Sequence, residues 1–168
     1  WDERSKYMGR ELRDRTFGAV GFGGIARATV QLLSSFGMKQ PIAFDPFVDP
    51  AIAKQLGVRL VKLDELLREA DFASIHCPLN KDTRDLIGAA ELAQMKPSAY
   101  VINCARGGIV NEAALLDALN GGRIKGAALD VQVKEPPDPN DPLLACDRLI
   151  LTPHSAAAAA LGRQIGTT

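Results

Sequence analysis

A glycine-rich turn near the start of the chain has the residue types and spacing that a dinucleotide phosphate needs. Gly21, Gly23 and Ala26 form a Gly-x-Gly-x-x-Ala pattern between an apolar run and a stretch with helical periodicity. The first glycine allows a tight reversal, the second lets the backbone approach a pyrophosphate, and the small third residue lets helix and strand pack closely. The pattern predicts a phosphate-binding turn at a helix N-terminus, although such turns often serve only to reverse the chain.

An acidic residue follows at the distance expected for a nucleotide ribose. Asp45 lies 19 residues after Ala26, at the end of the next apolar run. A carboxylate at this position can accept hydrogen bonds from an adenosine ribose, and it would repel a 2′-phosphate, so NAD is favoured over NADP. The alternative is that Asp45 caps a helix or shapes the turn before Pro46. The agreement between spacing and context favours cofactor binding.

Arg106 and His154 have side chains that could act on a substrate. Arg106 lies in an Arg-Gly-Gly turn, where its planar guanidinium has room to meet a carboxylate. His154 is one of two histidines and follows an apolar run, and an imidazole can take and return a proton near neutral pH. The alternatives are a surface ion pair for Arg106, a solvated Glu135 in its proline-rich loop, and an ordinary surface or core histidine. His76 fits a structural and a cofactor-lining role equally well.

Short apolar runs that alternate with helical stretches must position these side chains. The alternation predicts an α/β fold of the Rossmann type, a doubly wound parallel sheet with helices on both faces, in a single domain. Asn111 is expected to cap a helix, Gly37 and Gly121 to end helices, and residues 134–142 to form a proline-rich loop. The expected strands are residues 16–20, 41–44, 58–60, 72–75, 99–102, 124–129 and 149–151, and the expected helices are 24–36, 49–56, 63–69, 89–94 and 112–119.

The candidate residues follow these strands directly, which places them at one edge of the sheet. In parallel α/β sheets, ligands bind beyond the carboxyl ends of the strands. The residues expected at this edge are Gly21, Gly23, Asp45, His76, Arg106, Asp130 and His154.

Composition limits the classes of partner. Twenty basic and twenty acidic residues cancel, so the charge does not favour nucleic acid or an anionic membrane. No apolar run is long enough to span a membrane, and the start of the chain does not resemble a secretory signal. Cys77, Cys104 and Cys146 lack the spacing of a metal site or disulfide framework, so we expect no metal, small buried thiols and a cytoplasmic location.

Several motifs in order resemble the NAD-binding domain of the D-isomer-specific 2-hydroxyacid dehydrogenases. The resemblance covers residues 1 to about 157 of the chain. The motifs are GAVGFGGIA, FDPF, SIHCPLNKDTR, MKPSAYVINCARGGIVNEAALLDAL, GAALDV, KEPP and LTPHSA. An ordered set of this kind is far more specific than a lone glycine motif.

The resemblance implies roles for individual residues. Arg106 matches the arginine that holds the substrate carboxylate and carbonyl, His154 the catalytic histidine, and Glu135 the carboxylate paired with it. Asp130 and Cys104 match positions near the nicotinamide. The matching motifs also imply cofactor contacts for Gly24, Ile25 and Pro78.

The resemblance also implies what accompanies this chain. Family members divide a substrate domain between the sequence before and after the cofactor domain, so residues 1–168 would be one NAD-binding domain with a lead-in helix or arm at residues 1–15. We expect a small 2-hydroxy or 2-keto acid as substrate and a homodimer in the full-length protein. An isolated chain of this kind should bind NAD and turn over poorly.

Two other functions remain open at this stage. Some corepressors share this fold and keep its catalytic residues, so the chain could sense NAD(H) without turnover. An S-adenosylmethionine-dependent methyltransferase also uses a glycine turn and an acidic residue, but it leaves Arg106, Glu135 and His154 unexplained.

Overall fold

The structure is a computed structural model that describes residue 9 and residues 11–158 of the chain. Its centre is a seven-stranded sheet in which the paired strands run parallel, in the order β3-β2-β1-β4-β5-β6-β7. The order reverses beside β1, which is the point where doubly wound sheets bind ligands. The strands are β1 (Phe17–Val20), β2 (Ile42–Phe44), β3 (Arg59–Leu60), β4 (Phe72–Ile75), β5 (Tyr100–Asn103), β6 (Gly126–Leu129) and β7 (Leu149–Leu151).

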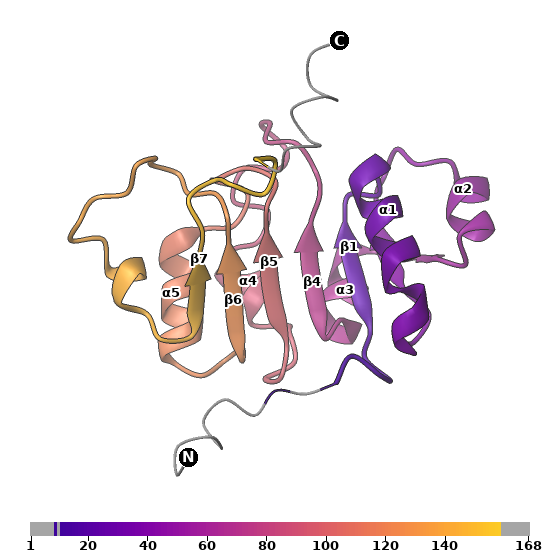
Figure 1. Cartoon of the computed structure of the whole chain (residues 1–168), viewed down its shortest axis with the longest axis horizontal. Coiled ribbons are helices and arrows are strands. Elements are labelled where there is room, and N and C mark those ends of the chain that lie inside the picture. The colour runs from indigo at the N-terminus through magenta and orange to yellow at the C-terminus, as the bar shows by residue number, and fades with distance from the viewer. Residues whose placement is uncertain (1–8, 10, 159–168) are drawn as a thin grey trace.

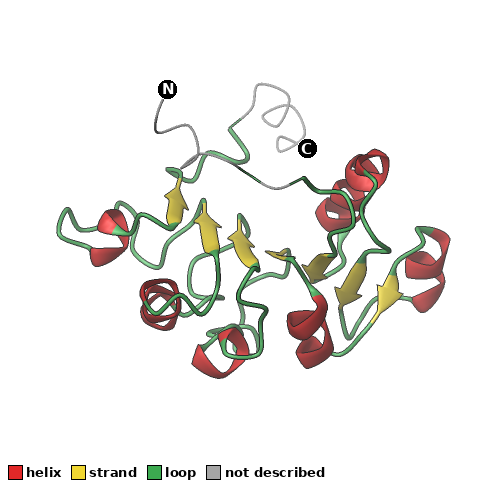
Figure 2. Cartoon of the chain, turned by 90° about the horizontal axis from the view of Figure 1, so that it is seen from below, coloured by secondary structure: helices red, strands yellow, loops and turns green. Residues whose placement is uncertain are grey.

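Helices lie on both faces of this sheet, which confirms the predicted Rossmann-type architecture (Figure 2). Residues of α1 and α2 share one core cluster with Phe17 and Ala19 of β1, and residues of α3, α4 and α5 share a second cluster on the opposite face. The helices are α1 (Gly24–Leu33), α2 (Pro50–Gln55), α3 (Leu63–Glu69), α4 (Ala89–Leu92) and α5 (Glu112–Asn120), with short 3₁₀ helices η2 (Ser34–Phe36) and η3 (Pro142–Ala145).

The face that carries α1 has no described helix over β5, β6 and β7 (Figure 1). Tyr100 and Ile102 of β5 are half-buried there, whereas Val101, which points to the other face, is fully buried. Ile150 of β7 is 67% exposed. The ring of Tyr100 stacks on that of Phe72, with centroids 5.6 Å apart. The described residues therefore leave an apolar strip of the sheet open on one side.

Helix α1 begins where it was predicted, and it buries small side chains while larger ones face outward. Ile25, Leu32 and Phe36 are exposed, while Ala26 and Val30 are buried against the sheet. The reason is close packing: Ala26 is 0% exposed, and a small side chain allows the near approach of helix and strand that the glycine turn requires. The α-helix also ends at Leu33, and a 3₁₀ turn leads to Gly37, which has the left-handed φ of 67° expected of a helix stop.

The remaining differences lie at element ends. Asn111 caps α5 as predicted, since its Oδ1 accepts from the N–H of Ala114 at 2.9 Å. The proline-rich loop is irregular up to Asp141, which caps η3. Of the expected lead-in, residues 1–8 and 10 lie outside the described residues, and residues 11–15 form a turn in which the N–H of Arg15 donates to the carbonyl of Leu12.

Candidate functional site

The glycine turn after β1 has the shape of a phosphate cradle. Gly21 has a φ of 91°, and a Cβ there would lie 2.7 Å from the backbone N of Cys77. Only glycine therefore fits between the ends of β1 and β4. A Cβ at Gly23 or Gly24 would meet no atom within 4 Å, so the space above the start of α1 is open. The turn fits a pyrophosphate at the N-terminus of a ten-residue helix.

Asp45 is tied to this turn by its carboxylate. Its Oδ2 accepts from the N–H of Phe22 at 2.8 Å, and its Oδ1 accepts from the N–H of Phe47 at 2.9 Å. Asp45 thus does shape the local backbone, which was the alternative interpretation of this residue. Each oxygen retains a lone pair that can accept from a ribose hydroxyl. The two interpretations are compatible.

Ile25 and Pro78 border the same turn. Ile25 lies in the first turn of α1 and is 76% exposed. Pro78 is exposed and follows Cys77, whose backbone touches Gly21. Both residues therefore lie at the edge where the cofactor is expected, and their contact with it stays a prediction.

The Arg106 turn is shaped by a buried asparagine that sequence reasoning did not single out. Asn103, 2% exposed, donates from Nδ2 to the carbonyl of Arg106 at 2.9 Å and accepts on Oδ1 from the N–H of Ala105 at 3.0 Å. These bonds fold the chain back directly after β5. The Arg106 side chain is exposed, and its Nη1 donates to the carbonyl of Ala105 at 2.6 Å. The other guanidinium donors are available to an anion.

His154 and Glu135 form a side-chain contact at hydrogen-bonding distance across two loops. Nδ1 of His154 lies 2.7 Å from Oε2 of Glu135, and Oε1 of Glu135 accepts from the N–H of Gln132 at 2.9 Å. The hydrogen bond with His154, followed by that from Gln132, holds the pKa of Glu135 below its ordinary value. The contact uses Nδ1, so Nε2 of His154 is left for a substrate. Histidine and carboxylate, 19 residues apart, meet as the resemblance implies.

Asp130 holds the segment that carries His154. Asp130 is 4% exposed, and its carboxylate accepts from the hydroxyl of Thr152 and from the N–H groups of Ser155 and Ala156, at 2.9 and 2.8 Å. Burial would raise the pKa of Asp130, but these hydrogen bonds outweigh burial and lower it. His154 itself has a left-handed φ of 51°, which is uncommon for a residue with a side chain and needs such support.

The Arg106 turn also packs against the loop that carries Glu135. A Cβ at Gly107 would lie 2.0 Å from the carbonyl oxygen of Gln132. The two backbones therefore touch, and glycine is required at this position. The Arg-Gly-Gly motif was predicted to give the guanidinium room, but the structure adds that it brings Arg106 and the Glu135–His154 pair to one place.

The other polar candidates have more modest roles. His76 lies beside the ring of Phe17, its Nε2 is buried without a described partner, and burial lowers its pKa, as for a packed neutral imidazole. Cys104 is exposed, which corrects the expectation that the thiols are buried. The reason is that β5 ends at Asn103, so Cys104 already lies in the turn that carries Arg106. Partial burial, with Asp130, raises the pKa of Cys104. Within residues 9 and 11–158, no group of three or more metal-ligating side chains occurs.

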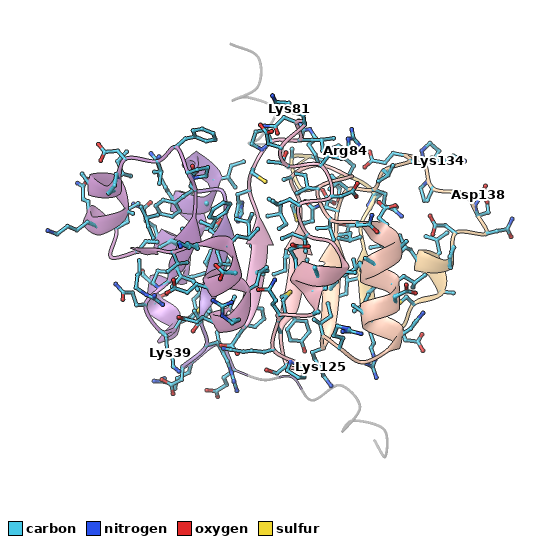
Figure 3. The ribbon with its side chains drawn as sticks, turned by 180° about the vertical axis from the view of Figure 1, so that it is seen from behind. Lys39, Lys81, Arg84, Lys125, Lys134 and Asp138 are labelled. Atoms are coloured by element: carbon cyan, nitrogen blue, oxygen red, sulfur yellow. The ribbon has the colours of Figure 1, made fainter. Side chains whose placement is uncertain are left out.

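Basic side chains lie at the same edge as the site. Figure 3 shows Lys81 and Arg84 there, while Lys39 and Lys125 lie at the opposite end of the strands. The N–H of Asp85 donates to the carbonyl of Gly108 at 2.8 Å, so the loop with Lys81 and Arg84 packs on the Arg106 turn. Lys81 and Arg84 can therefore attract an anionic group near the Arg106 turn, while Asp82 and Asp85 balance their charge within the same loop.

The fold and this edge define a dinucleotide-binding domain, and comparison with known proteins gives its family. Residues 1–156 match the model of the D-isomer specific 2-hydroxyacid dehydrogenase NAD binding domain. The chain belongs to this family. It is 45% identical over 156 residues to D-3-phosphoglycerate dehydrogenase of Archaeoglobus fulgidus, covering 93% of this chain and 29% of that protein. The corresponding protein of Methanocaldococcus jannaschii is 44% identical over 159 residues, 94% and 30% of the two chains.

Solved structures have the same fold as this chain. The TT0316 protein of Thermus thermophilus superposes with a TM-score of 0.86 at 36% identity, covering 94% of this chain and 49% of that one. The NAD-complexed D-isomer specific 2-hydroxyacid dehydrogenase of Lactobacillus delbrueckii gives 0.80 at 35% identity, with 91% and 49% covered. These comparisons confirm the predicted family, fold class and NAD cofactor. The chain spans less than a third of these curated relatives and about half of these solved chains.

Proposed function

We propose that this chain is the cofactor-binding part of an oxidoreductase that transfers hydride between NAD(H) and a D-2-hydroxy or 2-keto acid. The observation that carries the proposal is the 2.7 Å contact between Nδ1 of His154 and Oε2 of Glu135. It lies at the edge of the sheet that also bears the glycine turn and Arg106. A histidine ring held by a carboxylate at such an edge is the arrangement that general acid–base catalysis uses.

Asp45 and the glycine turn would hold the adenosine half of NAD. Gly21 makes the tight turn beside β4, Gly23 and Gly24 leave the backbone open to the pyrophosphate, and Asp45 accepts from the ribose. Ile25 and Pro78 would line this half, and Cys104 and Asp130 the nicotinamide half. The nicotinamide ring supplies the hydride acceptor when NAD is bound.

His154 and Arg106 would act on the substrate. In the oxidative direction Nε2 of His154 takes the proton of the 2-hydroxyl, and in the reductive direction it returns a proton to the carbonyl oxygen. The Glu135 carboxylate on Nδ1 orients the ring and stabilises the positive charge that develops on the imidazole as it takes the proton. The guanidinium of Arg106 binds the substrate carboxylate through two parallel N–H bonds.

A substrate domain would complete the site. The solved relatives are about twice as long as this chain, and the open apolar strip of Tyr100, Ile102 and Ile150 is a surface on which further chain can pack. A homodimer is also part of the proposal, supported by the exposed apolar side chains Ile25 and Leu32 of α1 and Phe36 of η2. No helix in the described part of the chain is long and apolar enough to cross a membrane. A cytoplasmic location is proposed from the free cysteines.

The proposal is tested on the protein that carries this chain together with its substrate domain. A panel of 2-keto acids is supplied with NADH, and oxidation of NADH is followed by absorbance. At least one keto acid should be reduced, and His154→Ala should abolish reduction while the affinity for NAD is kept. NAD binding without turnover of any keto acid would contradict the enzyme and favour an NAD(H)-sensing module.

A further inference from the structure

We propose that Glu112 is a positioning residue for the Glu135–His154 pair: it holds the loop after β6 against the start of α5, so that Glu135 reaches His154. The carrying observation is that Oε1 of Glu112 accepts from the N–H of Val133 at 2.7 Å. The inference rests on the proposed function, because it assigns Glu112 to the same acid–base pair.

The loop is anchored up to Gln132, since Val131 is buried and the backbone of Gln132 packs on Gly107. Val133, Lys134 and Glu135 are exposed, and Val133 keeps 63% of its surface open to solvent. Figure 3 shows Lys134 and Asp138 on a stretch that extends away from the body of the domain. Residues 133–136 have no buried side chain, so the position of this stretch depends on directional hydrogen bonds. The bond to Glu112 is such a bond, and it lies two residues before Glu135.

The environment of Glu112 has opposing effects on its carboxylate, because the first turn of α5 favours a negative charge while burial and nearby carboxylates oppose it. Burial is the main cause that raises its pKa; the N–H of Val133 opposes the rise, and the carboxylates of Asp141 and Glu135 add to it. A half-buried carboxylate beside two others is unfavourable in itself. Local conflicts of this kind are expected where a residue serves a site.

The contacts form one continuous support. Glu112 holds Val133, and the carbonyl of Gln132 packs on Gly107 of the Arg106 turn. The N–H of Gln132 then donates to Oε1 of Glu135, whose Oε2 contacts His154. Loss of the hydrogen bond between Glu112 and Val133 should therefore disturb the contact between Glu135 and His154.

Three variants of Glu112 distinguish the effect of its side-chain length from the effect of its charge. Glu112→Gln keeps an oxygen that can accept from Val133 and removes the charge. Glu112→Asp keeps the charge at the helix start but shortens the reach, and Glu112→Ala removes both. Glu91→Ala is the matched control, because Glu91 in the first turn of α4 accepts from the N–H of Gly88 in the same way, at 3.1 Å, away from this loop.

Two NMR readouts on this chain are independent of turnover. The first is hydrogen exchange of the Val133 amide, which should become faster in Glu112→Ala and Glu112→Asp and stay slow in Glu112→Gln. The second is the carboxyl ¹³C titration of Glu135, whose carboxylate faces His154, the N–H of Gln132, and the carboxylates of Asp130 and Glu112. Its pKa should rise toward the ordinary value in Glu112→Ala. In Glu112→Gln it should stay or fall further, because only a negative neighbour is lost.

The third readout is kcat of the protein with its substrate domain. Glu112→Ala should lose about 10- to 100-fold in kcat, the scale of a small misplacement of a reacting group, with the KM for NADH unchanged. Glu112→Gln should recover most of the loss, and Glu91→Ala should show none.

An unchanged Val133 exchange rate and Glu135 pKa in Glu112→Ala would overturn the inference; if that variant does not fold, the same result in Glu112→Asp would do so. Equal losses in Glu112→Gln and Glu112→Ala would also overturn it. Absence of dehydrogenase activity in the unmutated protein would instead refute the proposed function, and the two NMR readouts would still test the contact.

Discussion

Gly107→Ala is the substitution with the sharpest structural consequence in the site. The new Cβ would lie 2.0 Å from the carbonyl oxygen of Gln132, 2.3 Å from its carbonyl carbon and 2.7 Å from the N of Val133. These are backbone atoms, so no side chain can turn aside. The loop must retreat by about 1 Å or more before ordinary contact is restored. Such overpacking destabilises a domain by about 1–3 kcal/mol.

The same movement should separate Glu135 from His154. Because a misplacement of about 1 Å near the reacting groups can lower kcat about 100-fold, we expect a loss of that size. At about 2–4 °C per kcal/mol for a domain of this length, the melting temperature should fall by about 2–12 °C. The affinity for NAD should be nearly unchanged, because the glycine turn that binds the phosphates follows β1, whereas Gly107 and Gln132 follow β5 and β6.

The assays are thermal unfolding and NAD titration of this chain, and turnover by the protein with its substrate domain. Gly24→Ala is the control for unfolding, because a Cβ there meets no atom within 4 Å; its melting temperature should not fall. A Gly107→Ala protein with the wild-type melting temperature and kcat would show that the two loops do not touch as described. A loss of NAD affinity equal to the loss in kcat would contradict the claim that the Gly107–Gln132 contact serves turnover and not the binding of NAD at the glycine turn.

Four further substitutions test single residues. Asp45→Ala should weaken NAD binding and narrow the preference over NADP; an unchanged ratio in titrations with both would count against the ribose role. Arg106→Lys should raise the KM for the keto acid much more than the Kd for NAD, because an ammonium has no bidentate fork, and equal changes would indicate a structural role. His154→Gln should abolish turnover with NAD affinity kept, and residual activity near wild type would remove His154 from the chemistry. Asp130→Asn should be less stable than wild type near neutral pH and equal to it in acid. The pKa of Asp130 is lowered in the fold, so its stabilising effect exists above the unfolded pKa and disappears as pH falls through the folded one; parallel pH–stability curves would contradict this.

The sequence predicts the sheet well because its signal is local. Apolar runs, helical spacing and glycine stops determine each element within a few residues, and the strands from Phe72 and Leu149 begin where they were expected. The position of the candidate residues follows from one rule, that ligands bind beyond the carboxyl ends of parallel strands. This rule places Arg106 and His154 at one edge without any knowledge of contacts.

The rest depends on contacts between segments far apart in the chain. Asp130 bonds to Ala156, Glu112 to Val133, and Gly107 packs on Gln132. Nothing in the residue types at these positions reveals such pairs. The packing of α1 is a related case, because Ala26 is buried for its small size while the larger Leu32 faces outward. A pattern of hydrophobicity alone does not distinguish the two.

The central claim is that one edge of the sheet binds NAD through the glycine turn and presents its nicotinamide to His154 and Arg106. A crystal structure of this chain with NAD tests it most directly. The account predicts the pyrophosphate over Gly21 to Gly24, the adenosine ribose on Asp45, and the nicotinamide ring between the turns that carry Arg106 and His154. A nicotinamide bound elsewhere, with these two side chains pointing away from a common cleft, would contradict it.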